Sequence, residues 1–328
     1  MKFRNRIGRL AAGAAAALLA SSLAAGAQDI KIGVIFDYTG PLAAGGSEAG
    51  AIGTKIAIDM INERGGVEGH KINAIFVDAQ SKPDVAINEA ERLLNSEKVD
   101  LLMGVYSSAQ CVPLAAKVDA QKAFFWANIC VSSAVFKNRN LKYVFRAQVH
   151  SDTYGLVSPD FLAAYSKERF GIEPKDLKLA IIHEDGPYGS GMASGNEAGA
   201  ARHGMQVVLK EGYSRTTPDL SSLITKLKRA RPDVILHTGY NPDITLFFRQ
   251  SRELGLRFKV LIGHGAGYGV PDKLYKTFGN DIDYIFNVDP VSIWLLDPAT
   301  LAAGLGDITK MVGEAYKKEH PDVKAYSA

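Results

Sequence analysis

The chain has few cysteines, little net charge and no long uncharged apolar run. Two cysteines in 328 residues exclude a framework of several disulfides and a metal site built from clustered thiolates. The formal charge of +3 includes four basic residues that precede any acid, and without them it falls to −1. A net charge this close to zero predicts no nucleic acid partner. Those four residues are Lys2, Arg4, Arg6 and Arg9.

The segment 1–27 has the features of a secretory signal peptide. Its basic start is followed by the apolar run LAAGAAAALLA and by the small residues AGA before Gln28. This run is too short to be a good bilayer span. We therefore expect cleavage after Ala27 and a mature protein that lies in the periplasm.

The two cysteines allow two interpretations. Export makes a disulfide chemically possible. Cys111 is expected in the first turn of a helix and Cys130 just past the strand that follows that helix. Adjacent parallel strands would bring both residues to one edge of a sheet, which favours a bridge. Two small buried thiols remain the alternative.

Apolar, β-branched runs alternate with helical segments along the rest of the chain. IKIGVIF, HKINAIFVDA and VDLLMGVY are expected strands in the first half, and LKLAIIHED, DVILHTG and KVLIGHG in the second. Strands that alternate with helices predict a mostly parallel sheet covered on both faces. Because two such series meet near YVFRAQVHSD, we expect an α/β protein with two domains of similar build.

Hydroxyls, aromatics and glycines follow the predicted strands. In open α/β sheets a ligand binds outside the carboxyl ends of the strands. Helix N-termini there carry partial positive charge, and a serine hydroxyl beside one can complete a carboxylate site without lysine or arginine. The pattern suits a small, partly apolar anion held between two lobes. The residues are Tyr38 and Thr39, Tyr106 to Ser108, Cys130 to Ser133, His183 to Tyr188, Thr238 to Asn241, and His264 to Tyr268.

These residues also have purely structural interpretations. Ser107 and Ser108 can be plain helix N-caps, and Tyr188 and Tyr240 can be packing residues. The case for a binding site depends on all of these residues lying just after the carboxyl ends of predicted strands. No G-x-S-x-G elbow and no phosphate-binding G-x-x-x-x-G-K-[ST] loop is present, so the sequence predicts no enzyme of those types and no cofactor.

A metal site is a minor alternative. His183, His237 and His264 are all expected at strand ends of the second domain, where they could converge with Glu184 and Asp185 on a zinc ion. They lack any tight ligand spacing, and each could be a polar residue at the rim of the sheet. We therefore expect no metal, and an exported zinc-dependent enzyme is the least favoured function.

Several stretches carry a specific resemblance to a known family. They are IKIGVIFDYTGPLAAGGSEAGAIGTKIAIDMINERGGVEGHKI, the turn Gly104–Ser108, VFRAQVHSDTYG, IIHEDGPYGSG, HTGYNPDITLFFRQSRELGL and LIGHGAGYG. From Ile30 to its end the chain resembles the periplasmic leucine/isoleucine/valine-binding proteins, the soluble receptors of ABC importers. The resemblance implies two Rossmann-like lobes with parallel sheets joined by crossing strands, the type I periplasmic binding fold. It implies a first lobe of residues 28–147 and 288–328 and a second lobe of residues 148–287.

The resemblance also implies a ligand and a partner. The ligand is a small carboxylate or an amino acid, and the partner is the membrane permease of an ABC transporter. The ligand's carboxylate falls to Ser108 and Ser132 with the backbone at Cys130. Tyr188 and Tyr240 match tyrosines of the second lobe, and Tyr106 and Tyr268 are expected to line the site with them.

One departure from the family bears on the ligand. Amino-acid binders keep an acid for the ligand's ammonium at the place of Gly265, and a second such place falls on Ser151, beside Asp152. An unpaired buried ammonium would be costly, so we hypothesise an apolar acid, for example an aromatic one, without an α-amine. The alternative is a branched-chain amino acid whose ammonium is held by Asp152 or Glu184.

The family chain also continues past the position of Ala328, which suggests a truncated sequence.

Overall fold

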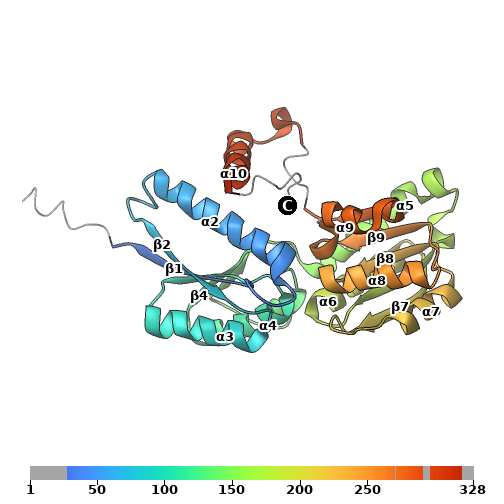
Figure 1. Cartoon of the computed structure of the whole chain (residues 1–328), viewed down its shortest axis with the longest axis horizontal. Helices are drawn as coiled ribbons and strands as arrows, with labels where there is room; N and C mark the ends of the chain where they lie inside the picture. The colour runs from blue at the N-terminus through green and yellow to red at the C-terminus, as the bar shows by residue number, and fades with distance from the viewer. Residues whose placement is uncertain (1–27, 270, 291–295, 320–328) are drawn as a thin grey trace, which may run out of the picture.

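The structure, a computed structural model, describes residues 28–269, 271–290 and 296–319. The predicted signal peptide and its cleavage site lie outside these residues. Two five-stranded sheets, both parallel, form two lobes and confirm the predicted α/β architecture (Figure 1). The first sheet has the order β2-β1-β3-β4-β5 and the second β10-β9-β8-β6-β7. The bounds are β1 Ile30–Phe36, β2 Ile72–Asp78, β3 Leu101–Gly104, β4 Phe124–Ala127, β5 Val144–Arg146, β6 Lys178–Glu184, β7 Gln206–Tyr213, β8 Val234–Thr238, β9 Val260–His264 and β10 Ile285–Val288.

Helices cover both faces of each sheet. In the first lobe α2 packs on one face and α3 and α4 on the other. In the second lobe α5 and α6 cover one face, and α7 and α8 cover the other. The helix bounds are α2 Glu48–Glu63, α3 Pro83–Arg92, α4 Ser108–Ala120, α5 Ser151–Phe170, α6 Pro187–Arg202, α7 Ser221–Ala230, α8 Asn241–Glu253, α9 Pro271–Phe278 and α10 Leu305–Glu319. Short turns of helix include η1 Ala43–Ser47, η3 Ser133–Val135 and η5 Ala266–Gly269.

The apolar runs become central strands because both of their faces are buried. Along β6, Leu179 and Ile181 pack towards α5 and α6, while Ala180 and Ile182 pack towards α7 and α8. Successive side chains of a strand point to opposite faces, so a strand covered on both sides must be apolar at consecutive positions. This explains why the apolar residues of KLAIIHE are consecutive and do not alternate with polar ones.

The chain passes between the lobes after β5 and again after β10. Ser151 N, at the start of α5, donates to Val131 O over 2.8 Å and so ties the second lobe to the first. Val288 still pairs with His264 in the second sheet, so the second lobe includes residue 288, where the return to the first lobe was expected to begin. Later α10 packs beside α2 (Figure 1). None of the described helices is both long and apolar enough to cross a membrane.

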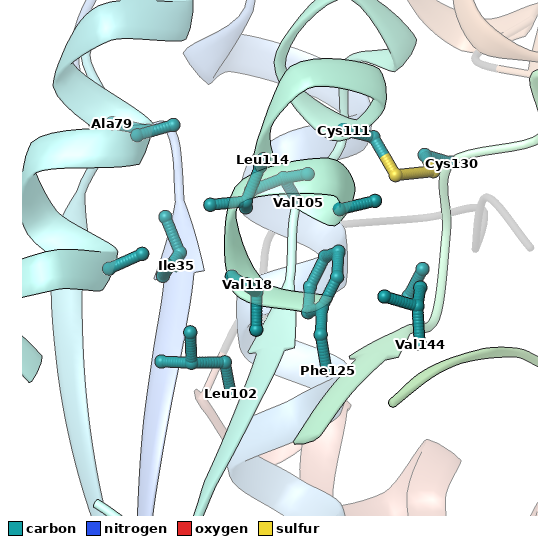
Figure 2. Close-up of a cluster of buried hydrophobic side chains, with 14 of the residues drawn as sticks. Ile35, Ala79, Leu102, Val105, Cys111, Leu114, Val118, Phe125, Cys130 and Val144 are labelled. Carbon is teal, nitrogen blue, oxygen red and sulfur yellow. A yellow bond between two sulfur atoms is a disulfide. The ribbon is translucent and has the colours of Figure 1, made fainter. Parts of the chain in front are cut away.

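A disulfide joins the first turn of α4 to the loop after β4. Cys111 and Cys130 are bonded, with an S–S distance of 2.05 Å and Cα atoms 6.4 Å apart, which confirms the predicted bridge. Figure 2 shows the bond at the edge of the buried cluster that contains Leu114 and Phe125. The bond therefore fixes the end of one strand to the start of the preceding helix.

A buried chain of hydrogen bonds supports the start of α8. His237 Nδ1 lies 2.6 Å from the Tyr268 hydroxyl, and its Nε2 lies 2.7 Å from the Tyr213 hydroxyl. Burial lowers the pKa of His237 to about 3, so its neutral ring offers one donor and one acceptor. The Tyr213 hydroxyl donates to Asp243 Oδ2 over 2.6 Å. Asp243 Oδ1 accepts from Tyr240 N over 3.0 Å, which fixes the residue that precedes α8.

The disulfide should stabilise the first lobe measurably. It closes a loop with a sequence separation of 19, and constraint of the unfolded chain by such a loop contributes about 3 kcal/mol. We expect the double substitution Cys111→Ala and Cys130→Ala to lower the free energy of unfolding by about that amount, measured by urea titration. Dithiothreitol should destabilise the wild type and leave the double variant unchanged. Equal stability of the reduced and oxidised wild type would contradict this.

The stability of the second lobe should depend on the ionisation of Asp243. Burial raises the pKa of this carboxyl from 3.8 to about 7. Between these values the folded state keeps a proton that the unfolded state has lost, so stability falls as the pH rises from about 4 to about 7. Asp243→Asn should reduce this decline by on the order of 4 kcal/mol. Urea unfolding of both proteins across this pH range tests it, and parallel stability curves would disprove it.

Candidate functional site

Residues of both lobes meet in one apolar cluster, which we call the interlobe cluster. Tyr106 of the first lobe packs edge-on against Tyr240 of the second, with ring centroids 5.7 Å apart. The Tyr240 ring lies 5.2 Å from that of Tyr188. The structure thus brings these three predicted tyrosines together at the carboxyl ends of strands from both sheets. The buried members are Leu42, Tyr154, Tyr188, Met192 and Tyr240, and Tyr106, Val131, Ala266 and Val288 are partly buried against them.

Ser107 is the N-cap of α4. Its hydroxyl accepts from Ala109 N over 3.2 Å, and Gln110 Oε1 accepts from Ser107 N over 3.3 Å, which completes a capping box. Burial raises the pKa of Tyr240 well above its ordinary value, and a hydrogen bond with the Ser107 side chain opposes that shift. Ser107 therefore caps its helix and also touches the opposite lobe.

Ser108 and Ser132 lie in direct contact beside the second lobe. Ser132 N donates to Ser108 Oγ over 3.3 Å, and the two residues are 0 % and 2 % exposed, respectively. The Ser132 hydroxyl donates to Pro187 O, at the start of α6, over 3.0 Å. The Ser108 hydroxyl at the N-terminus of α4 thus lies beside Ser132 at the start of η3, and the Ser132 hydroxyl contacts the first turn of a helix from the other lobe. Hydroxyls and a helix N-terminus are suitable donors to an anion.

Two tyrosines that were expected at the site lie elsewhere, and the side chain of Cys130 is buried in the disulfide, which leaves its backbone as a predicted contact. Tyr38 is 46 % exposed and lies outside the interlobe cluster, where its backbone N–H donates to Asp78 Oδ1. Tyr268 was expected to line the site, but its ring packs in the core of the second lobe. It does so because Gly263 has no side chain to keep the ring away from β9.

The two acids expected to hold an ammonium both accept hydrogen bonds from the protein. Glu184 is 2 % exposed, and its carboxylate accepts from Gly186 N over 2.8 Å and from Gly189 N over 2.6 Å at the start of α6. Burial raises the pKa of Glu184 despite these bonds. Burial alone would raise the pKa of Asp152, but the 2.5 Å hydrogen bond from the Ser133 hydroxyl helps to bring it below its ordinary value.

Gly265 lies against an acid that the sequence analysis did not single out. A β-carbon at position 265 would lie 3.3 Å from Tyr154 Oη, 3.5 Å from Asp289 Oδ1 and 3.6 Å from Tyr188 Oη. Asp289 directly follows β10, so the rule that a ligand binds outside the carboxyl ends of strands selects it once β10 is recognised as a strand of the second sheet. Gly265 also has a φ of +40°, which favours glycine.

The three histidines have separate partners. His183 Nδ1 lies 2.6 Å from Glu184 O, and His264 lies 2.9 Å from both the Ser158 and the Thr238 hydroxyls. Burial lowers the pKa of His264 to about 4, so its ring is neutral. Within the described part of the chain, no three histidine, cysteine or acidic side chains are grouped closely enough to hold a metal ion.

Comparison with known proteins places the chain among binding proteins. A family described as periplasmic binding protein matches residues 29–328. Leu/Ile/Val-binding protein homolog 7 of Brucella suis biovar 1 is 33% identical over 305 residues, which cover 93% of this chain and 74% of that protein. Homolog 8 of the same strain is 32% identical over 317 residues, which cover 96% of this chain and 76% of the relative.

Solved structures share the fold. A branched-chain amino acid transporter substrate-binding protein of Streptococcus pneumoniae, in complex with isoleucine, has a TM-score of 0.73 at 20% identity and covers 90% of this chain and 78% of its own. An ABC transporter solute-binding protein of Rhodopseudomonas palustris BisB5, in complex with 3,4-dihydroxybenzoic acid, has a TM-score of 0.69 at 20% identity, with 89% and 74% covered. Since the family match spans residues 29–328 and both Brucella relatives share nearly a third of their aligned residues, the chain belongs to the periplasmic binding protein family.

Proposed function

We propose that this chain is the exported solute receptor of an ABC importer and that it binds a small apolar carboxylate at the interlobe cluster. One observation carries the proposal: Ser108, at the start of α4, and Ser132, at the start of η3, lie side by side, and the Ser132 hydroxyl contacts Pro187 O, next to Tyr188 of the second lobe. Serine hydroxyls and the N-terminus of α4 can hold a carboxylate, while tyrosine rings can contact an apolar body. Binding of this kind needs no covalent step.

Contacts between the lobes support a clamp that closes on its solute. The Ser132 hydroxyl reaches Pro187 O, and Asn241 Nδ2 donates to Ala44 O over 3.4 Å. Such contacts form only when the lobes are together. A solute that touches both lobes would favour this closed form by its higher affinity for it. The closed form is then what a membrane permease would recognise.

The relatives leave the ligand class open. Two are named for leucine, isoleucine and valine, one neighbour holds isoleucine, and another holds 3,4-dihydroxybenzoic acid. Because position 265 has no acidic side chain, we expect a ligand that carries a carboxylate but no amine. The contacts of Asp152 and Glu184 support this expectation, since both carboxylates already accept hydrogen bonds from the protein. A branched-chain amino acid would need another carboxylate near the interlobe cluster.

A thermal-shift screen should find that carboxylates stabilise the protein. A panel of leucine, isoleucine, 4-methylpentanoate, benzoate and 3,4-dihydroxybenzoate tests the class. An acid present at 100 times its Kd adds about 2.7 kcal/mol of stability. The matching amides leucinamide and benzamide should have no effect. Failure of every acid, or equal stabilisation by the amides, would disprove a carboxylate site.

Ser108→Ala should weaken binding of whichever acid the screen identifies. Loss of one hydrogen bond to a charged group costs about 1.5–3 kcal/mol, which is roughly 10- to 150-fold in Kd by calorimetry. Ser194→Ala is the matched control, because that hydroxyl is on the exposed side of α6 and donates only to Ser190 O. If the two variants bind the acid equally well, Ser108 has no part in the site.

A further inference from the structure

A cavity lies at the end of the second lobe that is opposite the interlobe cluster. Its walls come from the last turn of α7, the residues after α8 and the segments that lead into β8 and β9. The interlobe cluster instead follows the carboxyl ends of strands, so the two places lie at opposite edges of the second sheet. Figure 1 shows α7 on the side of the second lobe away from the first lobe. The cavity has a volume of about 270 Å³, near the lower end of the range for small-molecule sites.

Among the described residues, three cationic side chains and no acidic one line this cavity. They are those of Lys228, Arg231 and Arg257, and all three are exposed. Lys228 Nζ donates to Leu254 O over 2.6 Å, just beyond the end of α8. Within the part of the chain that the structure describes, the guanidinium groups of Arg231 and Arg257 form no ion pair and no hydrogen bond. The cavity therefore holds positive charge that the protein does not neutralise.

The acids nearest in sequence do not neutralise this charge. Asp233 Oδ1 lies 2.9 Å from Lys259 Nζ, so this carboxylate already has a counter-ion. Glu253 is exposed at the end of α8 and does not line the cavity. An anion from outside the chain is therefore stabilised between the three cations.

Stabilisation of helix ends explains only part of this arrangement. Cations near a helix C-terminus offset its partial negative charge, and the effect falls off within the last turn. Lys228 is in the last turn of α7, and Arg231 is the residue that ends this helix. Arg257 lies beyond the last turn of α8, in the segment that leads into β9. A role at the helix ends therefore leaves Arg257 and the cavity itself unexplained.

The cavity offers space beside a fixed apolar wall. A β-carbon at Gly255 would meet no atom within 4 Å, and the φ of this residue is +63°. Leu227 and Leu256, by contrast, belong to the core of the second lobe and are 0 % and 5 % exposed, respectively. A small group thus finds open space at Gly255, next to side chains that the core already holds in place.

We propose that this cavity binds a phosphate monoester, either as a free ester or as the headgroup of an anionic phospholipid. Such a group carries a charge of about −1.5 to −2 at pH 7. A guanidinium group can donate two parallel hydrogen bonds to phosphate oxygens, and a lysine adds a point charge. Three cations exceed what a single carboxylate needs, which favours the more highly charged phosphate. The site is separate from the interlobe cluster and does not depend on the proposed function.

Calorimetry with glycerol 3-phosphate tests the free ester, at constant ionic strength and with glycerol as the uncharged control ligand. We expect the wild type to bind glycerol 3-phosphate and not glycerol. Arg257→Gln should weaken this binding about tenfold, because it removes charge-assisted hydrogen bonds. Arg249→Gln is the matched control, since Arg249 is exposed on α8 and does not line the cavity. It should bind the ester as the wild type does.

Sedimentation with vesicles tests the lipid headgroup. Phosphatidylcholine vesicles with and without phosphatidic acid are mixed with the wild type and with the same two variants. Association only with phosphatidic acid, weakened in Arg257→Gln and kept in Arg249→Gln, assigns the site to a lipid headgroup. Binding of glycerol 3-phosphate without any association with vesicles assigns it to a free ester.

Three results would overturn the proposal. The first is that the protein neither binds glycerol 3-phosphate nor prefers vesicles that contain phosphatidic acid. The second is an equal loss of binding in Arg249→Gln and Arg257→Gln, which would reduce the effect to net charge. The third is a lower thermal stability of Arg257→Gln with unchanged binding, which would leave Arg257 with a structural role only.

Ser108→Ala separates this site from the interlobe cluster. We expect this variant to bind glycerol 3-phosphate as tightly as the wild type, because Ser108 lies in the first lobe and the cavity lies at the far edge of the second. Loss of phosphate binding in Ser108→Ala would move the phosphate to the interlobe cluster and overturn the inference.

Discussion

All strands of each sheet run parallel, so each lobe has a single edge at which its strands end, and the two edges face each other. Tyr106 after β3, Tyr188 after β6 and Tyr240 after β8 meet for this reason. A parallel sheet also places the N-terminus of the following helix at that edge. Polar donors and aromatic rings from distant parts of the chain are thereby gathered in one place, without any sequence motif that spans them.

The residues that touch the site are held by buried polar groups behind them. Gln110 Nε2 donates to Asp37 Oδ1 over 2.7 Å, which anchors the turn that carries Ser107 and Ser108. In the second lobe Asp243 fixes Tyr240, and Glu184 caps α6 beside Tyr188. Buried acids that accept backbone N–H groups hold these turns more firmly than hydrophobic packing would, because hydrogen bonds are directional. In each lobe the turns that carry these residues are therefore anchored by hydrogen bonds to buried acids.

The strands and the pairing of the cysteines could be predicted from the sequence, because hydrophobic periodicity and the parallel order of strands determine both. The contact between Ser108 and Ser132 follows from the same placement. Side-chain direction could not be predicted in this way. Tyr268 turns into the core through space left by Gly263, and Tyr38 points to solvent. Asp289 becomes a candidate only when β10 is known to be a full member of the second sheet, and that membership depends on long-range packing.

The disulfide makes the geometry of the site depend on oxidation of the chain. Cys111 and Cys130 belong to the two segments that carry Ser108 and Ser132, so a covalent bond sets the spacing of the paired hydroxyls. Thiols stay reduced in the cytosol, and such bonds form after secretion. A newly made chain in the reducing cytosol would therefore hold these hydroxyls less firmly, and oxidative maturation would preorganise them only where the solute is to be captured.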